Sequence, residues 1–148
     1  MKGRPINILL VEDEEAHAVI VKRNLNDFKL ANKIYHVSDG QAALDYLYRR
    51  EAYSDALLFP KPELILLDLR LPKVDGLEVL KTIKTNPELM RIPVVIMTTS
   101  SAEKDVAQAY DHYANSYLVK PLDLQQFMPM LESLGLYWLI WNRAPDLS

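Results

Sequence analysis

Five polar side chains each follow directly after a short apolar stretch of the sequence. They are Glu12, Asp13, Asp68, Thr98 and Lys120. If the apolar stretches are parallel strands of one sheet, their carboxyl ends meet at one edge, and ligands of such sheets bind at that edge. The sequence therefore predicts a single site that holds three carboxylates, a hydroxyl and a lysine.

These residue types favour phosphate chemistry. Three carboxylates a few ångströms apart raise one another's pKa unless a cation offsets their charge. An all-oxygen ligand set without histidine or cysteine favours a hard divalent ion, and we expect Mg²⁺, which binds one or two carboxylates and shares phosphate oxygens. Lys120 can pair with one phosphoryl oxygen, and Thr98 can donate a hydrogen bond to another. A carboxylate beside the metal can then attack phosphorus and form an aspartyl phosphate.

The hydrophobic pattern predicts the elements that position these residues. Continuous apolar runs rich in β-branched residues are typical of strands buried on both faces, and apolar residues at helical spacing follow each run. Residues 51–62 have no clear period and contain Pro60 and Pro62, so they are interpreted as a long, partly packed loop. Five strand–helix repeats predict a parallel sheet with helices on both faces. The expected strands are 6–11, 34–37, 64–68, 94–97 and 116–119, and the expected helices are 14–28, 42–47, 77–83, 102–113 and 123–134.

Length and composition exclude several classes of protein. The chain has 148 residues and 17 Lys and Arg against 20 Asp and Glu, which gives a net charge of −3. We expect one domain over residues 1–148, without room for a DNA-binding domain and without the positive field that non-specific nucleic-acid binding requires. The absence of cysteine excludes disulfides and thiolate chemistry. The apolar run at 6–11 is too short for a signal peptide or a spanning helix, so a cytoplasmic protein without membrane contact is expected.

The chain resembles the receiver domain of bacterial response regulators over residues 6–134. The resemblance is carried by Glu12-Asp13, the segment LLDLRLPKVDG, Thr98 at the end of VVIMT, and Lys120-Pro121. It implies an α/β fold with a doubly wound, flavodoxin-like, five-stranded parallel sheet in the strand order 2-1-3-4-5. It also implies a two-component phosphorelay, in which a sensor histidine kinase donates the phosphoryl group. Such a protein signals through changed protein contacts and is not an enzyme with a separate substrate.

The same resemblance assigns roles to individual residues. Asp68 is the expected phosphoacceptor, and Lys120 holds the phosphoryl group together with Thr98. Glu12, Asp13 and Asp68 are the expected ligands of Mg²⁺, with the backbone carbonyl of Arg70. Arg70 also lies two residues after the acceptor, where this family tunes hydrolysis of the acyl phosphate.

A switch pair is expected at Thr98 and Tyr117. The threonine is drawn toward the phosphoryl group and the aromatic ring turns inward behind it. Thr99 is an alternative to Thr98, and Tyr117 also fits an ordinary core aromatic with a satisfied hydroxyl. The three histidines have no assigned role, and His17 is expected at the surface of the first helix, near the acidic turn.

The chain is most similar, within this family, to standalone regulators of cyanobacterial bacteriophytochrome kinases. This narrower resemblance depends on the loop at 54–62, the segment RIPVVIMTTSS and the aromatic tail at about 135–148. An apolar run in water is a contact surface or an aggregation hazard, so we expect a homodimer held by the tail. Alternatively, the tail extends the last helix and folds back over the domain. The residues expected at the dimer contact are Tyr137, Trp138 and Trp141.

Two other functions remain open from the residues alone. A haloacid-dehalogenase-type phosphatase also forms a strand-end aspartyl phosphate, but it usually carries a second aspartate two residues later, where this chain has Arg70. A phosphate-independent interaction module would keep the fold and leave the pocket unused. The complete set of pocket residues favours the receiver over both.

Overall fold

The computed structural model describes residues 6–27, 31–99, 102–121 and 123–133, and strands alternate with helices along these ranges. The strands are β1 (Ile6–Val11), β2 (Ala31–Val37), β3 (Leu64–Leu67), β4 (Val94–Thr98) and β5 (Ser116–Val119). The helices are α1 (Glu15–Asp27), α2 (Gly40–Leu47), α3 (Gly76–Thr85), α4 (Glu103–Asp111) and α5 (Phe127–Ser133). Short 3₁₀ turns form at Glu51–Tyr53 and Leu124–Gln126.

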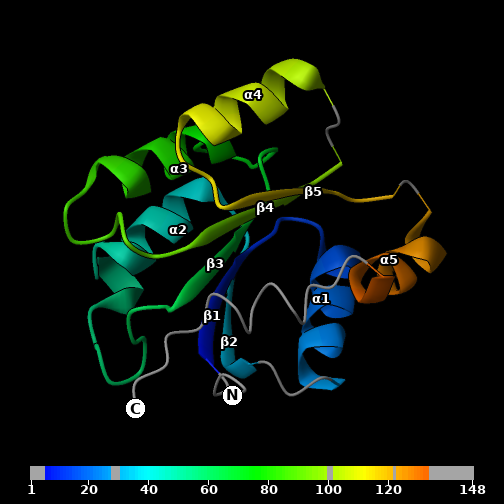
Figure 1. Ribbon diagram of the computed structural model, residues 1–148. Helices are drawn as coiled ribbons and strands as arrows, with labels where there is room; N and C mark the ends of the chain where they lie inside the picture. Colours follow the sequence, from blue (N-terminus) through cyan, green and yellow to red (C-terminus); the bar gives the residue numbers. More distant parts are fainter. Residues whose placement is uncertain (1–5, 28–30, 100–101, 122, 134–148) are drawn as a thin grey trace, which may run out of the picture.

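The strands form one parallel sheet in the order β2-β1-β3-β4-β5, which confirms the predicted topology. Helices α1 and α5 cover one face of the sheet, and α2, α3 and α4 cover the other (Figure 1). Each face has its own apolar core: Val21 and Phe127 belong to the first, and Leu80 and Ile83 to the second. Both faces of β1, β3 and β4 are therefore buried, as their continuous apolar sequences indicate.

Two element boundaries, the starts of β2 and α5, differ from the prediction by more than two residues. Strand β2 begins at Ala31, because backbone pairing with β1 continues through Lys33, whose exposed polar side chain interrupts the apolar pattern. The last helix begins at Phe127, because a 3₁₀ turn precedes it and the Asp123 carboxylate accepts a hydrogen bond from the backbone N–H of Gln125 at 2.9 Å. No helix in the described ranges has the length and apolar character that a membrane span requires.

The long loop between α2 and β3 packs through aromatic side chains, as expected for a partly packed loop. The rings of Tyr53 and Phe59 lie 5.1 Å apart between centroids, and Tyr46 on α2 contacts both rings. The Tyr46 hydroxyl donates a hydrogen bond to the backbone oxygen of Pro60 at 2.8 Å. The loop is thereby fixed against α2, while the side chains of Leu57 and Leu58 remain exposed.

Candidate functional site

The backbone continues the sheet pattern for one residue beyond three of the strands. The N–H of Asp68 donates to the oxygen of Val11 at 3.1 Å, and the N–H of Lys120 donates to the oxygen of Thr98 at 2.7 Å. The N–H of Glu12 donates to the oxygen of Val37 at 3.0 Å in the same way. The residues that follow β1, β3 and β5 are thus held by the sheet itself, and their side chains meet at its carboxyl edge.

Lys120 connects the predicted site residues. Its Nζ lies 2.5 Å from Oε1 of Glu12 and 2.8 Å from Oδ2 of Asp68. All three side chains are buried, and that of Lys120 is 1% exposed. Buried charges of this kind are tolerated only when they are paired and hydrogen-bonded. The predicted convergence of the carboxylates and the lysine is therefore present in the structure.

Glu12, Asp13 and Asp68 form an acidic cluster whose ligand oxygens all lie within 4.8 Å of one another. Burial raises the pKa of Glu12 to about 7; Lys120 opposes this shift, and the charge of Asp68 adds to it. Asp13 is exposed, so the cluster opens to solvent on its side. One lysine balances only part of the charge of three carboxylates, and an oxygen-only set fits a hard divalent cation. The residues present therefore fit the predicted metal.

The loop after β3 fixes the orientation of the Asp68 carboxylate. The backbone N–H of Arg70 donates to Oδ1 of Asp68 at 3.1 Å, so each carboxylate oxygen of Asp68 has a defined partner. Gly76, the first residue of α3, packs directly on this loop, and its N–H donates to the oxygen of Leu69 at 2.9 Å. A Cβ at this position would lie 2.3 Å from the backbone oxygen of Asp68. The LLDLRLPKVDG segment needs its glycine for this close approach.

His17 was expected at the surface, and that prediction is wrong. The residue is 7% exposed, its Nδ1 lies 2.9 Å from Nζ of Lys120, and its ring packs edge-on against Phe127. Burial and the charge of Lys120 lower the pKa of His17, so the neutral ring accepts a hydrogen bond from the ammonium. Its position one helical turn before Val21, on the buried face of α1, is the signal that the sequence offered.

Asp105 is a second residue that the sequence analysis missed. It lies in the first turn of α4, it is 3% exposed, and it forms an ion pair with the guanidinium of Arg70. An acidic residue in the first turn of a helix is ordinarily a solvated residue that favours the helix dipole. Nothing in its local sequence distinguishes it from Glu103, which is exposed.

The predicted switch pair lies on one face of the sheet. Tyr117 pairs with Ile96, two residues before Thr98, so the side chains of Thr98 and Tyr117 point to the same face. Thr98 is fully buried and Thr99 is exposed. Tyr117 is half-buried and packs against the core under α2, α3 and α4. The switching role itself stays a prediction. The tail residues Tyr137, Trp138 and Trp141 lie outside the described residues.

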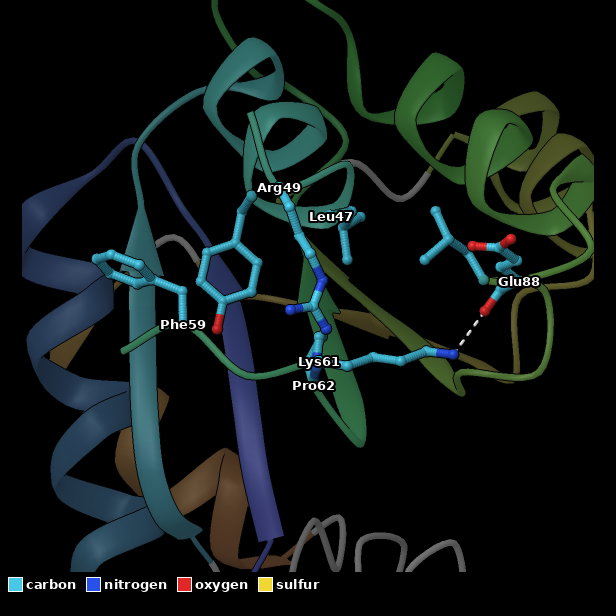
Figure 2. Close-up of a pocket in the computed structure, with 8 residues that line it drawn as sticks. Leu47, Arg49, Phe59, Lys61, Pro62 and Glu88 are labelled. Carbon is cyan, nitrogen blue, oxygen red and sulfur yellow. Dashed lines mark hydrogen bonds between the residues drawn. The ribbon is translucent and has the colours of Figure 1, made fainter. Parts of the chain in front are cut away.

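A separate cavity of about 250 Å³ is lined by residues of α2, of the loop before β3 and of the segment after α3 (Figure 2). Lys61 reaches across it and donates from Nζ to the backbone oxygen of Glu88 at 2.6 Å. Arg49 lines the same cavity and has a left-handed backbone, with φ of 57°. None of the predicted site residues borders this cavity, so it is not part of the candidate phosphate site.

Comparison with known proteins gives consistent matches over most of the chain. A family model described as "Response regulator receiver domain" matches residues 8–132. The chain is 46% identical over 141 residues to "Probable methanogenesis regulatory protein FilR2" of Methanothrix harundinacea, which covers 95% of this chain and 88% of that protein. It is 42% identical over 135 residues to "Response regulator Rcp1" of Synechocystis sp., with 91% of this chain and 90% of that protein covered.

Solved structures match the fold as well as the sequence. The Mn²⁺-bound crystal structure of Rcp1 has a TM-score of 0.80 and covers 91% of this chain and 95% of that one. The structure of the phosphorylated cyanobacterial phytochrome response regulator RcpA has a TM-score of 0.81 at 38% identity, and covers 91% of this chain and 94% of that one. A metal ion is thus bound in one of these relatives, and phosphorylation occurs in the other.

Proposed function

Because the chain belongs to the response regulator receiver family, whose members similar to it include phytochrome response regulators, we propose that Asp68 accepts a phosphoryl group from a sensor histidine kinase. The observation that supports this most directly is the buried contact of Lys120 with both Asp68 and Glu12, beside the exposed Asp13. An aspartate that is held by a buried ammonium and still borders a solvent-open acidic cluster is suited to accept phosphate.

The proposed reaction is an in-line displacement at phosphorus. An oxygen of Asp68 attacks, the bond from phosphorus to the donor histidine nitrogen breaks, and the electron pair stays on that nitrogen. Lys120 already lies 2.8 Å from Oδ2 of Asp68, so its ammonium can pair with the phosphoryl oxygens as they arrive. The hydroxyl of Thr98, at the end of the neighbouring strand, is the expected hydrogen-bond donor to another of these oxygens.

We assign the divalent cation site to Glu12, Asp13 and Asp68, with the backbone carbonyl of Arg70 as a further ligand. A bound Mg²⁺ supplies positive charge that offsets the charge on the phosphoryl oxygens. The side chains of Glu12 and Asp68 are held in place by Lys120 before any cation binds, since its ammonium contacts both. The phosphorylated receiver signals by changed protein contacts, and its own phosphorylation and dephosphorylation are its chemistry.

We further propose a phytochrome-type histidine kinase as the donor and a homodimer, in the cytoplasm, as the working form. The similarity to RcpA, a phytochrome response regulator, supports the kinase class. The 46% identity to FilR2, a methanogenesis regulatory protein by name, favours a kinase of another sensory class as the alternative. Incubation with a phytochrome kinase under red and far-red light distinguishes the two, because only the first makes phosphorylation depend on light.

The test of the acceptor is the intact mass of the protein after incubation with Mg²⁺ and acetyl phosphate. We expect one added phosphoryl group, which is absent in Asp68→Asn and absent when a chelator removes the metal. Asp75→Asn is the matched control, because Asp75 is an exposed acid in the same loop without a side-chain cap contact, and it should be modified like the wild type.

Failure of the folded protein to gain mass under any condition contradicts the proposal and favours the phosphate-independent interaction module. Mass gain in Asp68→Asn equal to that in the wild type contradicts the assignment of the acceptor. Release of phosphate from small phosphate esters would favour the phosphatase instead.

A further inference from the structure

Arg70 contacts the acceptor and a helix with two different groups. Its backbone N–H donates to Oδ1 of Asp68 at 3.1 Å. Its guanidinium forms an ion pair with the carboxylate of Asp105 in the first turn of α4. A single residue therefore joins the predicted phosphorylation site to α4, and its partner on that helix, Asp105, lies 35 residues beyond it in the sequence.

The two partners of this ion pair differ in their freedom to move. The Arg70 side chain is 58% exposed, whereas that of Asp105 is 4% exposed. The ion pair ties the first turn of α4 to the acceptor loop. When charge changes at the site, the exposed guanidinium is the group that can reorient.

A phosphoryl group on Asp68 would offer Arg70 a stronger partner than Asp105. It carries a charge between about −1.5 and −2 and has three acceptor oxygens, against one unit of charge on a carboxylate. Guanidinium groups bind phosphate oxygens through paired, charge-assisted hydrogen bonds. Because the backbone of Arg70 is already bonded to Asp68, its side chain starts beside the place where this charge appears.

We propose that the phosphoryl group on Asp68 and the carboxylate of Asp105 compete for the guanidinium of Arg70. This inference rests on the proposed function of Asp68. Asp105 is then a positioning residue: it holds Arg70 away from the acceptor in the unmodified protein and ties the first turn of α4 to the loop. Phosphorylation withdraws Arg70 from Asp105, and the contact that held α4 is broken.

The competition is tested by the affinity for beryllofluoride, which binds an aspartate oxygen and mimics the phosphoryl group. The affinity is measured by fluorine NMR in saturating Mg²⁺. Asp105→Asn should raise the affinity for beryllofluoride about fivefold, because no ion pair has to break. In a chain that already carries Arg70→Gln, adding Asp105→Asn should leave the affinity of that chain unchanged. Arg70→Gln alone should lower it severalfold. Glu103→Gln, which removes an exposed acid from the same helical turn, should have no effect.

Three results overturn the proposal: an unchanged or lower affinity in Asp105→Asn, the same rise with and without Arg70, or an unchanged affinity in Arg70→Gln. A purely structural role of Asp105 would not make its effect depend on Arg70. Arg70→Gln changes an exposed side chain, so the test remains decisive if Asp105→Asn does not fold. A wild-type protein that binds no beryllofluoride contradicts the proposed function as well, whereas equal binding in all variants contradicts only the competition.

Discussion

Lys120 sets the electrostatics of the site at the scale of single residues. Its ammonium contacts Glu12, Asp68 and His17, and each of these side chains is buried. Burial raises the pKa of Glu12 and Lys120 opposes this shift, while burial and the charge of Lys120 together lower the pKa of His17. Removing this one charge therefore removes a hydrogen-bond partner from all three neighbours.

We expect Lys120→Met to lower the free energy of unfolding by about 3 kcal/mol in metal-free buffer at pH 8. Truncating one partner of a buried ion pair leaves the remaining carboxylates without compensation. Urea unfolding measures the loss, and added Mg²⁺ should recover part of it, since the cation replaces some of the lost charge. Lys104→Met, at an exposed lysine on α4, is the control and should change stability by less than about 0.5 kcal/mol. Equal losses in the two variants would argue against the assignment.

The raised pKa of Glu12 predicts a pH dependence of metal binding. Burial raises this pKa from 4.5 to about 7, so the folded protein binds more protons than the unfolded chain between these values. Ionised Glu12 therefore destabilises the metal-free fold above pH 7, and this effect is relieved as the pH falls toward 4.5. A cation needs the ionised carboxylate, so Mg²⁺ affinity should fall below pH 7 by up to about tenfold per pH unit.

The measurement is a Mg²⁺ titration between pH 8 and pH 6. Glu12→Gln should weaken binding and flatten its pH dependence, whereas Glu15→Gln, at an exposed neighbouring acid, should keep the wild-type profile. A pH profile in Glu12→Gln as steep as that of the wild type would assign the titration to another group.

Residues differ in how far their roles could be predicted from the sequence. Asp68 and Lys120 were predictable because each directly follows a strand, and the end of a strand fixes where its next side chain lies. The role of Asp105 was not predictable, because its ion pair is with Arg70, which lies in a loop 35 residues away in the sequence. Local sequence carries no information about such a contact.

At the scale of elements, hydrophobic pattern predicted the type and order of the helices and strands but not all of their ends. Strand β4 is apolar up to its last residue, Thr98, and was placed to within one residue. The start of β2 depends on the backbone pairing of Lys33 with β1, and the start of α5 follows a turn in which the Asp123 carboxylate accepts a hydrogen bond from the backbone N–H of Gln125. Neither polar residue has a hydrophobic signal. The packing of α3 on the acceptor loop is likewise a tertiary feature, and it depends on Gly76.

Gly76→Ala should displace the acceptor loop. The added methyl group would lie 2.3 Å from the backbone oxygen of Asp68 and 2.4 Å from Cα of Leu69, so the loop or the helix has to shift. We expect a loss of about 2 kcal/mol in the free energy of unfolding and a slower reaction with acetyl phosphate. Thermal unfolding and intact mass measure the two effects. Glu78→Ala, an exposed change in the same helix, should alter neither the stability nor the reaction rate. If Gly76→Ala also left both unchanged, the acceptor loop would accommodate the methyl group, and the prediction would be wrong.

At the scale of the whole molecule, the described residues form the receiver fold and its site, and the proposed dimer contact is in the tail that follows them. The sheet, its two cores and the acidic cluster all lie between residues 6 and 133. The family match, at residues 8–132, coincides with this part of the chain. The apolar run in the tail follows it, and its composition supports a contact between subunits.

Deletion of residues 137–148 should give a monomer that still accepts phosphate on Asp68. The described sheet, helices and site lie within residues 6–133, whereas the proposed contact consists of the aromatic side chains in the deleted segment. Light scattering after gel filtration measures the mass, and intact mass after acetyl phosphate measures the acceptor. A truncated protein that stays dimeric would exclude the tail as the dimer contact, and one that no longer reacts would place the tail against the receiver.

The backbone hydrogen bond that extends the sheet beyond β3 limits how often the backbone of the acceptor opens to solvent. The N–H of Asp68 donates from the end of β3 to β1, and both of these strands are buried on both faces, so its proton can exchange with solvent only when that part of the sheet opens. Loops at functional sites commonly open far more often than the core. Here the backbone of the acceptor shares the opening frequency of the core, which keeps the carboxylate of Asp68 in position for as long as the protein remains folded.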